Sequence, residues 1–386
     1  MSNWQEWADA QTAQVHAAGQ WRAPRSFDAT SAHGTEGTVA VGDGAGDGEP
    51  RAVVSFASND YLGLTRHPAV VTAAHEAIDR WGTGSGAARL IVGSRPVHDE
   101  LEHALAAWKR TERAVLFSTG FAANIGVLAT FAGPDVLVVS DELNHASLID
   151  GRRLAGAPLA VYDHCDPAHV ERILLASDAP RALVVTESVF SMDGDVTPVD
   201  ELAAVCARHG ALLAIDEAHA VLGPDPDLTG ERFAGLDVLR VGTLSKTLGA
   251  LGGFVAGPAR FTDLLVNQAR SYIFTTASTP ADTAAALAAL GVLRSDEGAE
   301  LRARLHANID RVRPGHPSPI IPYVCGSETR TLDTAAALLD EGILVTAIRP
   351  PTVPPGTSRL RVAISAAHTD EQLDHLAEVL QQQFPT

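Results

Sequence analysis

Cysteine and positive charge are both scarce in this sequence. Its 386 residues contain 3 Cys, and 29 Lys plus Arg against 47 Asp plus Glu, which gives a formal net charge of −18. Cys165, Cys206 and Cys325 stand alone without metal-ligand spacing, which favours reduced thiols and predicts neither disulfides nor a metal site. An acidic surface repels phosphate backbones and anionic headgroups, so we expect no binding to nucleic acid or to membrane surfaces.

Long apolar runs are also lacking. The least charged long stretch, residues 119–140, contains Asn124, Pro134 and Asp135, which favours a buried helix, a turn and a strand over a membrane span. Residues 1–9 are acidic and lack the basic-then-apolar layout of a secretion signal. Together with the reduced thiols, these absences predict a cytoplasmic protein.

Apolar residues, by contrast, make up 46% of the chain, which is enough for a sizeable core. Between residues 55 and 294, short apolar runs alternate with segments of helical spacing. The apolar runs cover residues 114–117, 136–139, 182–185, 212–215, 238–241 and 253–255. The helical segments cover residues 100–109, 121–129, 170–175, 199–207 and 281–294. This alternation predicts an α/β fold with a mainly parallel sheet covered on both faces.

The sequence predicts three parts along the chain. An arm (residues 1–55) is expected to open with a helix carrying Trp4, Trp7 and Trp21 and to contain a turn-rich loop at residues 42–48. A large domain (56–295) and a smaller C-terminal α+β domain (296–386) follow. The smaller domain has expected strands at 320–324, 342–346 and 360–364 and helices at 331–339 and 371–381.

Polar side chains follow two of the apolar runs. Asp216 ends one run, and Lys246 comes shortly after the next. Each alone has an ordinary interpretation, a turn-capping acid or a surface lysine. In open α/β sheets, however, ligands bind beyond the carboxyl ends of the strands. Pyridoxal phosphate (PLP) requires a lysine for covalent attachment, an acid that pairs with its pyridine nitrogen and a helix start that binds its phosphate. The segment at residues 118–124 supplies such a helix start.

Eight short segments then identify a family resemblance. The chain resembles the α-oxoamine synthases, PLP enzymes of the aspartate-aminotransferase fold (fold type I), and keeps the family's motif order from about residue 4 to its end. The matching segments are SNDYLGL (58–64), GFAAN (120–124), HASL (145–148), VFSMDGD (189–195), DEAH (216–219), TLSK (243–246), AIRPPTVP (347–354) and RLR (359–361). The resemblance implies a mainly parallel seven-stranded sheet in the large domain.

The resemblance also implies a role for each matching cofactor residue. Lys246 would carry PLP and move the Cα proton, Asp216 would pair with the pyridine nitrogen, and His219 would bond the ring's phenolic oxygen. His145 would stack on the ring and steer the acyl group. The remaining cofactor residues are Ser191 near the ring oxygen, and Gly120, Phe121, Thr243 and Ser245 at the phosphate.

Substrate carboxylates call for arginine, whose planar fork binds them through two hydrogen bonds. By resemblance, Arg361 with Asn59 would take the amino-acid carboxylate. The acyl side would be formed by Arg22, Arg349 and Thr352. Arg359 and Arg361 alternate on an expected strand, so the competing interpretation is a solvated pair on one face.

Among family members, the Arg349–Thr352 context favours the one that joins L-alanine to a pimeloyl thioester in biotin synthesis, releasing CO2, free thiol and 8-amino-7-oxononanoate. The pimeloyl group would arrive on coenzyme A or on acyl carrier protein. Glycine C-acetyltransferase, 5-aminolevulinate synthase and serine palmitoyltransferase share nearly all the cofactor residues and are the alternatives, followed by a non-catalytic homologue. The family forms homodimers, so we expect a homodimer. Alanines in residues 82–90 depart from the family pattern and leave substrate preference open.

Overall fold

The computed structural model describes residues 3–41, 49–228 and 230–385. The loop expected at residues 42–48 lies outside these ranges. The chain forms two compact units, one of residues 59–304 and one of residues 1–58 with 305–386. The arm and most of the expected small domain therefore belong to the same unit. The predicted domain boundaries at residues 55 and 295 stay predictions.

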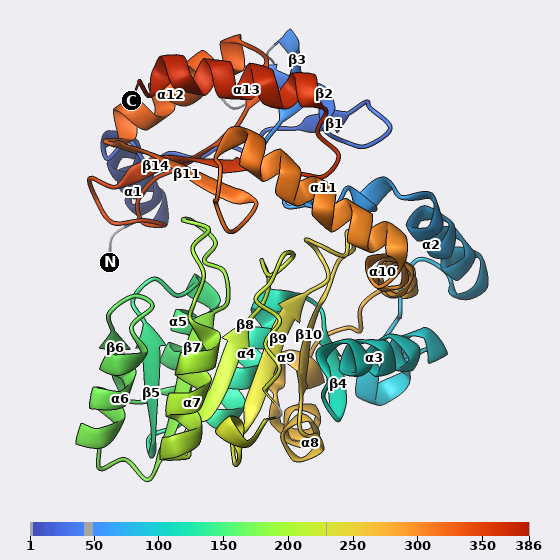
Figure 1. Ribbon diagram of the computed structural model, residues 1–386, viewed down its shortest axis with the longest axis vertical. Helices are drawn as coiled ribbons and strands as arrows, with labels where there is room; N and C mark the ends of the chain where they lie inside the picture. Colours follow the sequence, from blue (N-terminus) through green and yellow to red (C-terminus); the bar gives the residue numbers. More distant parts are fainter. Residues whose placement is uncertain (1–2, 42–48, 229, 386) are drawn as a thin grey trace. The chain divides into compact units, whose positions relative to one another are not determined.

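A seven-stranded sheet organises the unit of residues 59–304 (Figure 1). In spatial order its strands are β4 (Arg113–Phe117), β10 (Gly253–Gly257), β9 (Val238–Thr243), β8 (Leu212–Asp216), β7 (Arg181–Glu187), β5 (Val136–Asp141) and β6 (Leu159–Tyr162). The neighbours from β9 to β6 pair in parallel, whereas β10 is antiparallel to both β4 and β9. The predicted mainly parallel α/β sheet is confirmed.

Helices cover both faces of this sheet (Figure 1). Val127, Leu128 and Leu265 pack in a core on one face, and Val170 and Leu202 pack in a core on the other. The helices of the unit are α2 (Pro68–Trp81), α3 (Pro96–Lys109), α4 (Gly120–Phe131), α5 (Ala146–Ala155), α6 (Pro167–Ala176), α7 (Val199–His209), α8 (Ala259–Gln268), α9 (Arg270–Ile273) and α10 (Pro280–Leu293). Helix α11 (Asp296–Val312) contains the boundary at residue 304.

Local sequence signals explain where several helices begin and end. The Asp166 side chain accepts a hydrogen bond from the His169 N–H at the start of α6, and Pro167 occupies the first turn. Gly210 ends α7 with a φ of 62°, a left-handed conformation that glycine adopts without steric cost. Such helix caps can be recognised in a sequence because they involve residues only a few positions apart.

Two smaller sheets build the other unit. One has the order β1 (Phe27–Ala29), β2 (Glu36–Val41), β3 (Glu49–Ser55) and β12 (Ile343–Leu344); the other has the order β11 (Ile320–Gly326), β14 (Ser358–Ala363) and β13 (Thr346–Ile348). Its helices are α1 (Trp4–Ala17), α12 (Glu328–Asp340) and α13 (Asp370–Gln383). Strand β12 pairs in parallel with β3, so a strand of the arm and a strand of the C-terminal segment share a sheet.

Three local expectations need correction. Trp21 lies beyond α1, which ends at Ala17. The single strand expected at residues 342–346 is divided between β12 and β13, which belong to different sheets. Strand β6 was missed although its residues, LAVY, form a short apolar run; this strand forms the edge of its sheet, and its side chains alternate between exposed and more buried positions. Among the described residues, no helix is both long and apolar enough to cross a membrane.

Candidate active site

The carboxyl ends of three neighbouring parallel strands bring acidic and hydroxyl side chains to one edge of the large sheet. Glu187 ends β7, Asp216 ends β8 and Thr243 ends β9. Glu187 is the direct register partner of Asp216, and Asp216 is the partner of Val241, two residues before Thr243. This edge is where ligands bind in open α/β sheets, as the sequence predicted.

Lys246 belongs to a chain of hydrogen bonds at this edge. Its Nζ lies 2.7 Å from His219 Nε2, and His219 Nδ1 lies 2.6 Å from the Tyr61 hydroxyl. The Tyr61 hydroxyl donates to Asn59 Oδ1 at 3.1 Å. Because that hydroxyl has a single proton, it accepts from His219 Nδ1–H, which leaves Nε2 to accept from Lys246. Tyr61 and His219 are both buried, so the chain holds the lysine amine at a defined place.

A second chain of hydrogen bonds connects Asp216 with His145. Asn124 Nδ2 donates to Asp216 Oδ2 at 2.6 Å and to Ser147 Oγ at 2.9 Å. The N–H and hydroxyl of Ser147 lie 3.2 and 2.8 Å from His145 Nδ1. Ala218 N–H donates to the other oxygen of Asp216 at 2.9 Å. Asp216 is therefore buried with both oxygens held in place.

The same contacts select the form of the His145 ring. Because the Ser147 N–H donates to Nδ1, the proton of the neutral imidazole sits on Nε2. Desolvation by the surrounding protein lowers the pKa of His145, with the Asp216 carboxylate opposing that shift and Lys246 adding to it. The residue itself remains exposed, so a neutral imidazole can present an Nε2–H donor to a ligand.

The start of α4 has the features of a phosphate site. Thr119 caps this helix, and its first residues are Gly120 and Phe121, whose backbone N–H groups have no partner within the helix. A Cβ on Gly120 would come within 3.2 Å of the Thr243 side chain. Thr243 Oγ1 and Ser245 Oγ lie 2.7 Å apart. The residues present thus fit a phosphorylated cofactor, with hydroxyl and backbone donors for the phosphate and a buried acid for a ring nitrogen.

Glu187 is a site residue that the sequence analysis missed. It is 3% exposed, and its Oε1 has no hydrogen-bond partner among the described residues. Burial and the neighbouring Asp216 carboxylate raise its pKa to about 8. Glu187 ends the apolar strand segment VVTE just as Asp216 ends its strand, so the sequence carried the same indication of a site residue. No matching motif in the sequence assigned a role to Glu187.

We expect Glu187→Gln to change how stability depends on pH. The ordinary pKa of Glu is near 4.5, so between pH 4.5 and 8 the folded protein keeps a proton that the unfolded chain has lost. The contribution of Glu187 to the free energy of unfolding is therefore largest below pH 4.5. It falls as pH rises to 8, by on the order of a few kcal/mol. Urea unfolding from pH 5 to 8 should show that the free energy of unfolding of E187Q rises relative to that of the wild type as pH increases. A difference between the two proteins that stays constant over this range would contradict the prediction.

The predicted acyl-side residues lie together in the unit of residues 1–58 and 305–386. Arg22, Arg349 and Thr352 line one cavity of about 820 Å³, whose walls are otherwise largely apolar. Arg22 donates to the Pro350 carbonyl, and Arg349 donates to the Gly19 and Trp21 carbonyls while its Nε has no partner among the described residues. Burial and the charge of Arg22 lower the pKa of Arg349. Arg25 and Arg51 also line the cavity, and Arg51 pairs with Asp340, so a carboxylate entering it would meet guanidinium groups.

Arg361 lies on β14 in the same unit. It is 5% exposed, and Arg359 is 7% exposed with its Nε bonded to the Thr357 carbonyl. The competing interpretation of a solvated arginine pair on the strand surface is therefore wrong. The ten predicted residues of the other unit are Asn59, Gly120, Phe121, His145, Ser191, Asp216, His219, Thr243, Ser245 and Lys246.

Comparisons with known proteins show the family of the chain. The model of the class I and II aminotransferases matches residues 51–380. The 8-amino-7-oxononanoate synthase of Anaeromyxobacter sp. (strain K) is 49% identical over 347 residues, 87% of each chain, and that of Methylococcus capsulatus is 46% identical over 355 residues, 88% of this chain and 90% of its own. A serine palmitoyltransferase variant from S. paucimobilis, solved with PLP and myriocin bound, has a TM-score of 0.86 and 29% identity over 97% of this chain and 96% of its own.

Proposed function

The chain belongs to the class I and II aminotransferase family, and we propose that it condenses L-alanine with a pimeloyl thioester, with loss of CO2 and free thiol, to form 8-amino-7-oxononanoate in biotin biosynthesis. The observation that carries the chemistry is the contact between Lys246 Nζ and His219 Nε2 at the strand edge where Asp216 is buried. The substrates follow from the curated relatives, which bear the name of this synthase and match nearly the whole chain.

The proposed cofactor is PLP, which when bound supplies an electron sink beside the amino-acid Cα. Asp216 would pair with the ring nitrogen, and its two oxygens are already oriented by Asn124 and Ala218. Gly120, Phe121, Thr243 and Ser245 would bind the phosphate. Ser191 and His219 would contact the ring oxygen.

Lys246 would transfer the proton of the alanine Cα. Its amine would take the Cα proton of alanine and later return one to the product carbon, with His219 holding the amine between these steps. His145 presents Nε2–H, because Ser147 occupies its Nδ1. That donor would stabilise negative charge on the thioester oxygen during acyl transfer.

Arginines would bind the two carboxylates of the substrates. We assign the alanine carboxylate to Arg361 with Asn59. We assign the acyl side to the cavity lined by Arg22, Arg349 and Thr352, since its apolar walls suit a methylene chain and its guanidinium groups suit the far carboxylate of a pimeloyl group. The acyl carrier would be coenzyme A or acyl carrier protein.

We further propose that the protein acts as a cytoplasmic homodimer. Leu90, Ile91 and Val92 are 50%, 73% and 69% exposed, and Phe274 is 69% exposed. Large exposed apolar side chains of this kind mark association surfaces. Light scattering should give twice the mass of one chain, and a monomeric mass would refute this part of the proposal.

The reaction is tested by thiol release from pimeloyl-CoA with purified protein, PLP and L-alanine. We expect alanine-dependent release with 8-amino-7-oxononanoate as the product, and none in the control without amino acid. Release with glycine or serine and acetyl-, succinyl- or palmitoyl-CoA, but not with alanine and pimeloyl-CoA or pimeloyl-acyl carrier protein, would assign a sibling reaction and overturn the proposal.

A further inference from the structure

A buried charge network lies next to the cofactor acid. We define the charge network as Lys109, Glu217, Arg240 and Asp225. Glu217 Oε2 lies 2.7 Å from Lys109 Nζ, and Glu217 Oε1 accepts from Arg240 Nε at 2.6 Å. Arg240 also donates to the Lys109 carbonyl at 3.1 Å and to Asp225 Oδ1 at 2.6 Å. These four side chains carry two positive and two negative charges, and Arg110 also pairs with Asp225 at 3.4 Å.

Three of the four side chains are almost completely buried. The side chains of Lys109 and Arg240 are each 4% exposed and that of Glu217 is 2% exposed, whereas that of Asp225 is 44% exposed. Removing ions from water costs several kcal/mol each, so such a network is weak as a device for stability alone. Its geometry instead ties together three elements, the end of α3, the turn after β8 and the middle of β9.

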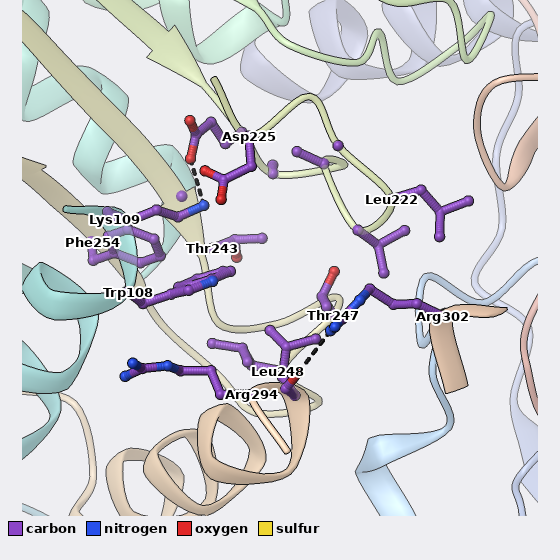
Figure 2. Close-up of a pocket in the computed structure, with 17 residues that line it drawn as sticks. Trp108, Lys109, Leu222, Asp225, Thr243, Thr247, Leu248, Phe254, Arg294 and Arg302 are labelled. Carbon is purple, nitrogen blue, oxygen red and sulfur yellow. Dashed lines mark hydrogen bonds and ion pairs between the residues drawn. The ribbon is translucent and has the colours of Figure 1, made fainter. Parts of the chain in front are cut away.

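The network faces the loop that carries Lys246. Figure 2 shows Lys109 and Asp225 on one side of a cavity of about 390 Å³. Thr243, Thr247 and Leu248, which flank Lys246 in sequence, line the same cavity. The walls of this cavity therefore include Lys109, Glu217 and Asp225 of the charge network together with the loop that carries Lys246.

Glu217 links the network to the site residues through the backbone. It directly follows Asp216, and its own N–H donates to the Val241 carbonyl at 2.7 Å. Its carbonyl accepts from Ala220 N–H at 3.1 Å across the turn that contains His219. While Asp216 contacts Asn124 of α4, the neighbouring Glu217 side chain is held by α3 and β9. A shift of Glu217 would move the residues on both sides of it.

We propose that Lys109, Glu217 and Arg240 are positioning residues, which hold the turn after β8 so that Asp216 and His219 meet the cofactor and Lys246 in reactive geometry. This inference rests on the proposed function, because it concerns the same site. These residues would act by orienting the side chains that touch the ligand. At metal centres, loss of such supporting residues typically lowers affinity or activity by about ten- to a hundredfold.

The test compares Glu217→Gln with Glu171→Gln. Glu171 pairs with Arg208 between α6 and α7, which do not line the cavity, so its exchange removes one paired carboxylate, 34% exposed, elsewhere in the same unit. PLP is titrated into each apoprotein, and kcat and KM for alanine are measured. We expect E217Q to weaken PLP binding and lower kcat by about tenfold each, with KM for alanine little changed, and E171Q to match the wild type.

A second variant separates positioning from folding. Lys109→Met with Glu217→Leu removes one cation and one anion together, and leaves Arg240 paired with Asp225. Such exchanges of buried ion pairs for apolar groups are often neutral for stability. We expect this double variant to melt near the wild type and still bind PLP about tenfold more weakly. Wild-type PLP affinity in it, or equal affinity in E217Q and E171Q, would overturn the inference; failure of the wild type to bind PLP would instead overturn the proposed function.

Discussion

Replacing Lys246 with Ala should abolish alanine-dependent thiol release, with kcat falling by at least about 10⁴-fold. The amine is both the predicted point of cofactor attachment and the group that moves the Cα proton. The remaining candidate, His219, contacts the amine at 2.7 Å and is itself held by Tyr61, so it has no freedom to replace it. Removal of a group that serves in several steps is not compensated by its neighbours.

The composition of the chain makes the attachment site easy to assign. The sequence contains two lysines, Lys109 and Lys246. Lys109 is buried in an ion pair with Glu217, so it is not free to react. Borohydride reduction in the presence of PLP, followed by peptide mass analysis, should label the wild type at Lys246 and leave Lys246→Ala unlabelled. Labelling or turnover that persists in this variant would refute the assigned role.

Asp216→Asn should produce the second largest loss, about 10³-fold in kcat. The exchange keeps the size of the side chain but removes the negative charge that would hold a proton on the cofactor ring nitrogen. Asn124 and Ala218 donate to both oxygens of Asp216, so the new amide nitrogen would face a donor in either orientation. Both the charge and the hydrogen bonding are therefore disturbed.

Steady-state kinetics with PLP at saturation measure this effect apart from weakened binding. Asp200→Asn, at the exposed first turn of α7, is the matched control and should retain wild-type activity. Loss of less than tenfold in D216N under these conditions would mean that the ring nitrogen does not depend on this carboxylate.

Much of the large sheet was predictable because its strands are buried on both faces. A parallel strand covered by helices on each side reads as an apolar run, as in LLAI before Asp216; in VLRVGT before Leu244 that run is interrupted by Arg240. The residue that ends such a run lies at the edge where ligands bind, so Asp216 and Thr243 could be assigned to one site from the sequence. The short strands of the arm lacked that signal, because they are partly exposed.

The contacts that give the site its chemistry were not predictable in the same way. Tyr61 and His219 are 158 positions apart, and Asn124 and Asp216 are 92 apart. Glu187 ended an apolar run as Asp216 did, but its raised pKa depends on burial and on the neighbouring Asp216 carboxylate. No spacing rule connects such positions, because their proximity results from the order in which the strands are arranged in the sheet.

The sequence by itself determined the α/β class, the strand end that carries Asp216, the segment after β9 that carries Lys246, the helix start at Gly120 and, through its motifs, the family. These features depend on periodicity and on neighbours within a few residues. Only the tertiary structure decided which ring nitrogen of His145 and of His219 carries the proton. It also decided why the pKa of Glu187 is raised and how Lys109 and Arg240 hold the Glu217 side chain. Hydrogen bonding and desolvation depend on what surrounds a group in space, and distant segments supply those surroundings only when the chain folds.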